Sequence, residues 1–130
     1  MKHYNVVAAV VCHDGKYLCM QKGKTKFEYT SYKWEFPGGK IEPGETPQQA
    51  LARELMEEME YPVEVGDELV TVNHEYPDFS ITMTAFLCTP KGDANGFKRR
   101  EHADSKWCSK DELKGLNWAA ADVGVVASIL

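Results

Sequence analysis

Three glutamates, Glu54, Glu57 and Glu58, lie close together in the chain and directly follow Arg53. On a helix, spacings of three and four residues place their carboxylates on one side, where like charges repel. One interpretation is a solvated acidic face with an ordinary Arg53–Glu57 ion pair of little worth. The other is a binding site for a hard divalent cation, because Mg²⁺ prefers oxygen ligands and often bridges carboxylates to substrate phosphates.

The stretch 46–59 is predicted to form the helix that carries these carboxylates. Thr46 is a suitable N-cap, Pro47 has the backbone angle that a first helical residue needs, and Gln49 completes a capping box. A broad apolar face consists of Leu51, Ala52, Leu55, Met56 and Met59. We expect this face to pack against a sheet.

The segment 39–58 resembles the Nudix box, a long motif of fixed residues at fixed spacing. The matching positions hold Gly39, Glu45, Arg53, Glu54, Leu55, Glu57 and Glu58. The last position of the box is Gly in the family and Glu60 here. Either a left-handed Glu60 costs about 1 kcal/mol, or the helix ends differently.

The resemblance implies a hydrolase that uses Mg²⁺, with Mn²⁺ as the alternative metal. The implied metal ligands are Glu54, Glu57, Glu58, Glu101 and the backbone carbonyl of Gly38. It further implies that Arg53 orients the catalytic carboxylates and that Glu45 braces the loop. Glu54 is the first candidate for the base that activates water and Glu101 the second, although Glu101 also reads as an exposed loop acid.

The candidate substrate-binding residues are Lys22, Tyr76, Asp78, Phe79 and Asp122. Asp122 matches the place where the family puts an amide or carboxylate that reads the nucleobase, although it also reads as a helix N-terminal acid. An ionised carboxylate accepts hydrogen bonds from guanine, whereas a protonated one donates to cytosine N3 and accepts from its amino group. Phe27 and Tyr29 are further candidates for the pocket wall, whereas His13, His74 and His102 are expected to be isolated residues that are structural or exposed.

The rest of the chain predicts one α/β domain, 1–130, with a mixed sheet between helices. This agrees with the α/β/α sandwich that the resemblance implies. The expected strands are 6–12, 17–21, 34–36, 63–75, 81–88 and 106–108, with a small helix after Ser109 and a terminal helix with Val123, Val126, Ala127 and Leu130 on one side. Residues 23–33 and 89–100 are expected to be loops, and 77–79 a turn.

Composition narrows the class of partner. The 130 residues carry a formal net charge of −5, which argues against a nucleic-acid polymer because binding to a phosphate backbone needs a basic surface. No apolar run is long enough to span a membrane and no signal-peptide pattern is present, so a cytoplasmic protein is expected. The four cysteines are expected to be buried free thiols.

The function expected from these observations is hydrolysis of a (deoxy)nucleoside triphosphate to a monophosphate and pyrophosphate by a monomer or homodimer. A cytidine-type or oxidised-guanine nucleotide is the leading substrate, in a role that cleans the nucleotide pool. Hydrolysis of a nucleotide sugar or dinucleotide is the enzymatic alternative. A non-catalytic nucleotide sensor should have lost box carboxylates, and a plain interaction domain leaves the Gly–Glu–Arg spacing unexplained.

Overall fold

The computed structural model describes residues 1–130, and its centre is a sheet of seven strands. The strands are β1 (Lys2–His13), β2 (Lys16–Lys22), β3 (Trp34–Glu35), β4 (Gly38–Lys40), β5 (Val63–Glu75), β6 (Phe79–Pro90) and β7 (His102–Cys108). Their order is β3-β2-β1-β6-β5, with β4 also paired to β1 and β7 to β2. Only β1 and β6 run parallel, so the sheet is mixed, as predicted.

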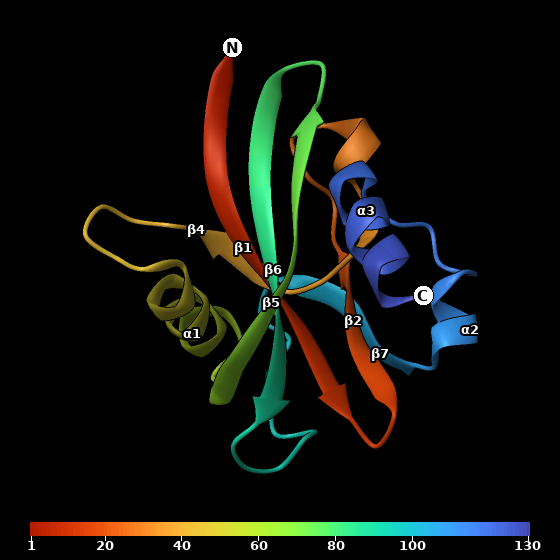
Figure 1. The fold of residues 1–130 in the computed structure, drawn as a ribbon. Coiled ribbons are helices and arrows are strands. Elements are labelled where there is room, and N and C mark those ends of the chain that lie inside the picture. Colours follow the sequence, from red (N-terminus) through yellow and green to blue (C-terminus); the bar gives the residue numbers. More distant parts are fainter.

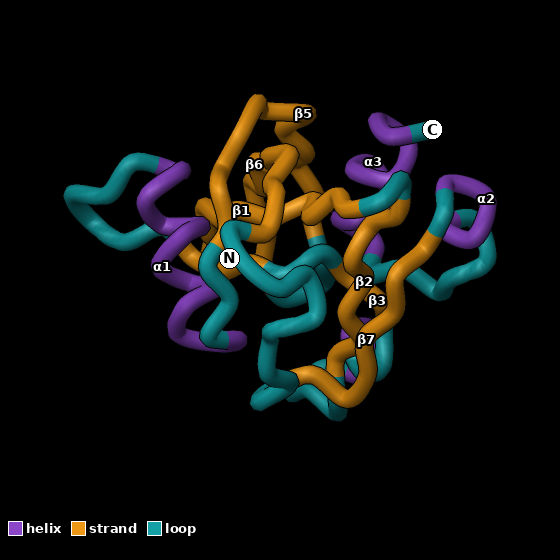
Figure 2. The backbone as a smooth tube through the Cα atoms, turned by 90° about the horizontal axis from the view of Figure 1, so that it is seen from below, coloured by secondary structure: helices purple, strands orange, loops and turns teal.

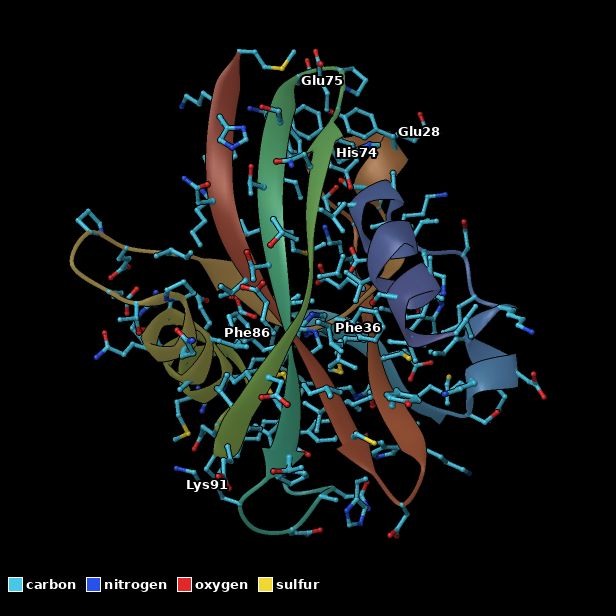
Figure 3. The ribbon with its side chains drawn as sticks, in the orientation of Figure 1. Glu28, Phe36, His74, Glu75, Phe86 and Lys91 are labelled. Carbon is cyan, nitrogen blue, oxygen red and sulfur yellow. The ribbon has the colours of Figure 1, made fainter.

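Helices cover the two sides of the sheet (Figures 1 and 2). Helix α1 (Pro47–Met59) lies on one side, while α2 (Lys110–Leu113) and α3 (Ala120–Ile129) lie on the other. Phe86 points to the α1 side and Phe36 to the α3 side (Figure 3), and each belongs to a separate hydrophobic cluster. The predicted α/β/α sandwich is therefore confirmed. None of the helices combines the length and apolar character required to cross a bilayer.

Helix α1 begins as predicted. The Thr46 hydroxyl accepts from the Gln49 amide at 3.1 Å, and the Gln49 side chain accepts from the Thr46 amide at 3.0 Å. The predicted apolar face is partly wrong, since Met56 is 48% exposed whereas Ala50 is buried. Met56 lies about 100° around the helix from the buried Leu55, which turns it away from the sheet.

The helix ends at Met59, and Glu60 adopts the left-handed conformation with φ 48° and ψ 43°. The first of the two alternatives for this position is therefore correct: the chain keeps the turn that a glycine would make, with a side chain in it. A residue other than glycine in this conformation costs about 1 kcal/mol.

Several predicted boundaries are wrong at strand ends. Gly38 and Gly39 belong to strand β4 instead of a loop, because β4 pairs with β1 at residues 6–8. Phe79 begins β6 instead of ending a turn, since it pairs with Lys2 of β1. Strand β7 begins at His102 instead of 106, and a 3₁₀ turn occupies Glu28–Thr30 within the predicted loop 23–33. Hydrogen bonding to a neighbouring strand determines where these strands begin and end. The pattern of apolar residues along the sequence does not record this pairing.

The segment before α3 adds to the edge of the sheet at β3. The Trp34 amide donates to the Asn117 carbonyl, and the Ala119 amide donates to the Trp34 carbonyl. This pairing sets Asp122 beside Phe36. The predicted side of the terminal helix is wrong in part. Val126 is buried, but Val123 and Leu130 are about half exposed and Ala127 is exposed as well. Ala121, Asp122 and Val125 complete the buried side. All four cysteines are free, three of them buried.

Candidate active site

The two glycines of β4 are places where backbone and carboxylate come close. A β-carbon on Gly38 would overlap the Val7 carbonyl, and one on Gly39 would overlap the Glu54 carboxylate. Glycine at these positions therefore lets β4 pair tightly with β1 and lets the Glu54 side chain lie against the strand.

Arg53 connects the loop before α1 to the glutamates on the helix. Its guanidinium donates to both carboxylate oxygens of Glu45, at 2.6 and 2.9 Å, and to Glu54 and Glu57, at 3.1 Å each. A further bond reaches the carbonyl of Lys40 in β4. The hydrogen bonds from Arg53 hold the pKa of Glu45 below its usual range. Arg53 thereby fixes the distance between strand β4, the loop and the acidic side of α1.

Glu45 also closes the loop itself, because its carboxylate accepts from the backbone amide of Glu42 at 2.9 Å. Sequence reasoning expected Glu45 to brace this loop, and the structure places it there.

Glu54 and Glu58 lie together beside the sheet. Burial, and then the neighbouring carboxylates of Glu54, Glu101 and Glu35, raise the pKa of Glu58 to about 8. Glu57 lies apart: its side chain is 61% exposed and is paired with Arg53. No group of three or more His, Cys, Asp or Glu side chains converges into a ready-made metal site.

A second charged group lies on the neighbouring strands. The Glu35 carboxylate is 3.0 Å from His102 Nε2 and 3.5 Å from Lys22 Nζ. The His102 side chain is only 6% exposed, and its Nδ1 is buried without a partner. The expectation that His102 is an isolated structural or surface residue is therefore wrong about its isolation, because the strand pairing of Lys22 with His102 brings it to Glu35.

A cavity of about 730 Å³ lies on the α3 side of β1, beside Lys22 and Glu35 of the second charged group. All five predicted substrate-binding residues line it, namely Lys22, Tyr76, Asp78, Phe79 and Asp122. Glu35, Gly38 and Gly39 line it as well. The cavity thus extends from the glycines that contact the glutamate cluster to the N-terminus of α3.

Asp122 is the most buried polar group of the cavity, at 4% exposure. Its Oδ1 accepts from the Phe36 amide at 2.9 Å. Burial, and then the nearby Glu35 carboxylate, raise the pKa of Asp122. The Tyr76 hydroxyl beside it accepts from the Ala121 amide at 3.1 Å, which leaves its proton directed elsewhere. This end of the cavity therefore presents both donors and acceptors.

Stacked aromatic rings form one wall of the cavity. Tyr76 stacks on Tyr29 and on Phe79, and Phe27 stacks on Tyr29 in turn. The Tyr29 hydroxyl donates to Asp78 at 2.7 Å, which ties the 3₁₀ turn to the β5–β6 hairpin. The flat rings offer a stacking surface for a planar ligand.

Sequence reasoning missed Glu35 and His102. Glu35 lies in the expected strand 34–36 between two aromatic residues, so an inward carboxylate there was a recognisable signal. His102 had no such signal, because its burial depends on the register of β7 against β2.

A glycine strand, an Arg-held glutamate cluster and an aromatic cavity with polar groups at its end fit the hydrolysis of a phosphorylated small molecule. The sequence profile of the NUDIX domain matches residues 1–128, and the chain belongs to the Nudix hydrolase family.

Named relatives agree with this family. The chain is 34% identical over 131 residues to the CTP pyrophosphohydrolase of Escherichia coli K12, which covers all of this chain and 93% of that protein. It is 41% identical over 88 residues to an 8-oxo-dGTP diphosphatase of Proteus vulgaris, covering 68% of this chain and 78% of that one.

Solved structures show the same fold. The solution structure of the E. coli ORF135 protein superposes with a TM-score of 0.82 at 32% identity, covering 99% of this chain and 89% of that one. The MutT protein of methicillin-resistant Staphylococcus aureus 252 gives a TM-score of 0.72 at 38% identity, covering 99% and 97%.

Proposed function

We propose that this Nudix hydrolase cleaves a (deoxy)nucleoside triphosphate with water to give the monophosphate and pyrophosphate, and that it removes cytidine-type or oxidised-guanine nucleotides from the pool. The observation that carries the proposal is the cavity of about 730 Å³ whose lining includes both Gly38 and Gly39 of β4 and Asp122 of α3. We place the phosphates at the glycine end, where Gly39 adjoins Glu54, and the base at the aromatic end. The relatives named for CTP and 8-oxo-dGTP support this choice of substrate.

Nudix hydrolases depend on a divalent metal, and we propose Mg²⁺, with Mn²⁺ as the alternative. The residues fit such an ion: the charges of Glu54 and Glu101 both act on Glu58, Arg53 is bonded only to Glu54 of these three, and Gly39 leaves space for the Glu54 carboxylate. Glu57 and the Gly38 carbonyl complete the proposed ligand set. A cage of three protein ligands is not required, because Mg²⁺ keeps several waters and is commonly held by one or two carboxylates with substrate phosphates. When bound, the metal supplies charge neutralisation and an acidified water.

The chain's own residues position the reaction. Arg53 holds Glu54 against β4, so that the Glu54 carboxylate accepts the proton of the attacking water in a fixed geometry. Glu101 is the other candidate for this proton, because its charge acts on Glu58 and raises the pKa of that carboxyl. Phosphoryl transfer needs positioning and charge neutralisation more than covalent help, which matches a site without a nucleophilic side chain.

The base is proposed to bind between the aromatic wall and Asp122. A protonated Asp122 donates to cytosine N3 and accepts from the cytosine amino group, and its raised pKa favours this form. An ionised Asp122 suits the N–H edge of guanine instead. Lys22 and Glu35 supply one donor and one acceptor beside it.

The decisive experiment measures pyrophosphate release from a panel of nucleotides with Mg²⁺, with Mn²⁺ and with chelator. Turnover of CTP, dCTP or 8-oxo-dGTP that stops on chelation supports the proposal. Turnover of a nucleotide sugar or dinucleotide alone would replace it with the enzymatic alternative, and tight binding without turnover would favour a sensor.

A monomer or homodimer in the cytoplasm, without a nucleic-acid polymer as partner, stays a prediction.

A further inference from the structure

The end of helix α1 is the surface on which the long loop before β7 docks. The Lys98 amide donates to the Met59 carbonyl at 2.8 Å, and the Tyr61 hydroxyl donates to the Ala94 carbonyl at 2.8 Å. The rings of Tyr61 and Phe97 meet edge to face at 5.3 Å. Residues on both sides of Glu60 therefore hold the same loop.

Glu60 adds charged contacts to this docking. Its carboxylate pairs with Lys98 Nζ at 3.0 Å and with the guanidinium of Arg100. Arg100 also donates to the backbone carbonyl of Glu57, at 3.4 Å. The box glycine of the family would relieve the left-handed strain at this position, but it would remove both ion pairs.

Glu60 contacts Arg100, which is the residue immediately before Glu101. Arg100 and Glu101 are adjacent in sequence, and Glu101 lies close enough to Glu58 to act on its charge. Beyond Glu101 the chain enters β7 at His102, whose register with Lys22 is fixed by the sheet. The orientation of Glu101 is thus set from one side by β7 and from the other by the segment that Glu60 holds.

We propose that Glu60 is a positioning residue for the hydrolysis: it fixes Lys98 and Arg100 to the end of α1 so that Glu101 faces Glu54 and Glu58. The inference rests on the proposed function, in which Glu101 takes part in the reaction. Glu60 then gives up the conformational ease of a glycine in exchange for two ion pairs with the segment that leads to Glu101.

The test combines substitutions at positions 60 and 101. Glu60→Gln should lower kcat about fivefold with little change in KM, the loss expected when two exposed ion pairs that order a loop are removed. Glu60→Gly should lower kcat similarly while its unfolding temperature stays equal or rises, because the left-handed strain is relieved. A merely structural role would instead make activity follow stability.

The Glu101→Gln background separates tethering from other effects. There, adding Glu60→Gln should change kcat no further, since the tether has nothing left to position. An equal loss of kcat in both backgrounds would overturn the inference. If Glu101→Gln alone leaves kcat unchanged, the proposed role of Glu101 fails, and the effect of Glu60 on the reaction fails with it.

Amide exchange tests the tether without reference to activity. Exchange at residues 98–101 should accelerate in Glu60→Gln, and an unchanged rate would refute the tether itself. The matched control is Lys114→Gln, which breaks an exposed ion pair with Asp111, far in sequence from Glu60. It should leave both kcat and the amide exchange of residues 98–101 unchanged.

Discussion

Gly39 and Glu54 adjoin so closely that a β-carbon on residue 39 would occupy the space of the Glu54 carboxylate. The two residues come from different elements, β4 and α1, and Arg53 holds the same carboxylate from the other side at 3.1 Å. Glu54 is therefore confined between a bare backbone and a guanidinium. This confinement is what a group that must meet a water molecule in one geometry needs.

Gly39→Ala should leave the fold intact but displace Glu54. The added methyl meets the end of a flexible side chain, so the structural cost is small, whereas a shift of about 1 Å in a reacting group costs roughly 100-fold in kcat. Thermal unfolding and steady-state kinetics measure the two effects.

Two other glycines serve as comparisons. Gly92 has open space around it, so Gly92→Ala should alter neither the unfolding temperature nor kcat. Gly38→Ala faces the Val7 carbonyl and should damage the fold itself. Full activity in Gly39→Ala would show that Glu54 does not need its position against β4.

Glu54→Gln should lower kcat by about 10²- to 10⁴-fold with the fold retained, the range expected for loss of a general base. The amide keeps the hydrogen bond from Arg53 but takes up no proton. Pyrophosphate release and circular dichroism are the measurements, and Glu64→Gln on the exposed edge of β5 is the control. A mild loss only would remove Glu54 from the role of base and leave Glu101 as the candidate.

Asp122→Asn should change the ranking of nucleobases. The Asn side chain keeps an oxygen that accepts from the Phe36 amide, but it cannot donate and accept in the pattern of a protonated carboxyl on the same atoms. The ratio of kcat/KM values for CTP and 8-oxo-dGTP should shift by about tenfold or more, as for loss of one specific hydrogen bond in a buried site. An unaltered ranking would exclude Asp122 from base reading.

The same residue makes stability depend on pH. Because the pKa of Asp122 is raised by burial, the folded chain binds a proton there that the unfolded chain has released above about pH 4. The free energy of unfolding should therefore fall as pH rises from that value toward the raised pKa. Urea unfolding at several pH values should show a shallower decline in Asp122→Asn.

The control for this prediction is Asp111→Asn, since Asp111 is 95% exposed at its side chain. It should leave the pH dependence as in the parent chain. An Asp122→Asn variant whose stability falls with pH as steeply as that of the parent would show that Asp122 is ionised in the folded chain.

The sequence alone determined the features that depend only on residues close together in the chain. Thr46 and Gln49 fix the start of α1 through a capping box, and spacings of three and four place Arg53 beside Glu57. The resemblance to the Nudix box, which depends on the spacing from Gly39 to Glu58, identified the family that the profile match then showed. The left-handed Glu60 was one of the two alternatives that this resemblance left open.

The tertiary structure decided what depends on contacts between distant strands. His102 reaches Glu35 only through the register of β7 on β2, and Asp122 is buried because the segment before α3 pairs with Trp34. Met56 is exposed because the sheet covers only part of the apolar side of α1. Residue types and spacing set the chemistry that each side chain can do, whereas burial and partners arise from packing between segments far apart in sequence, which no local pattern records.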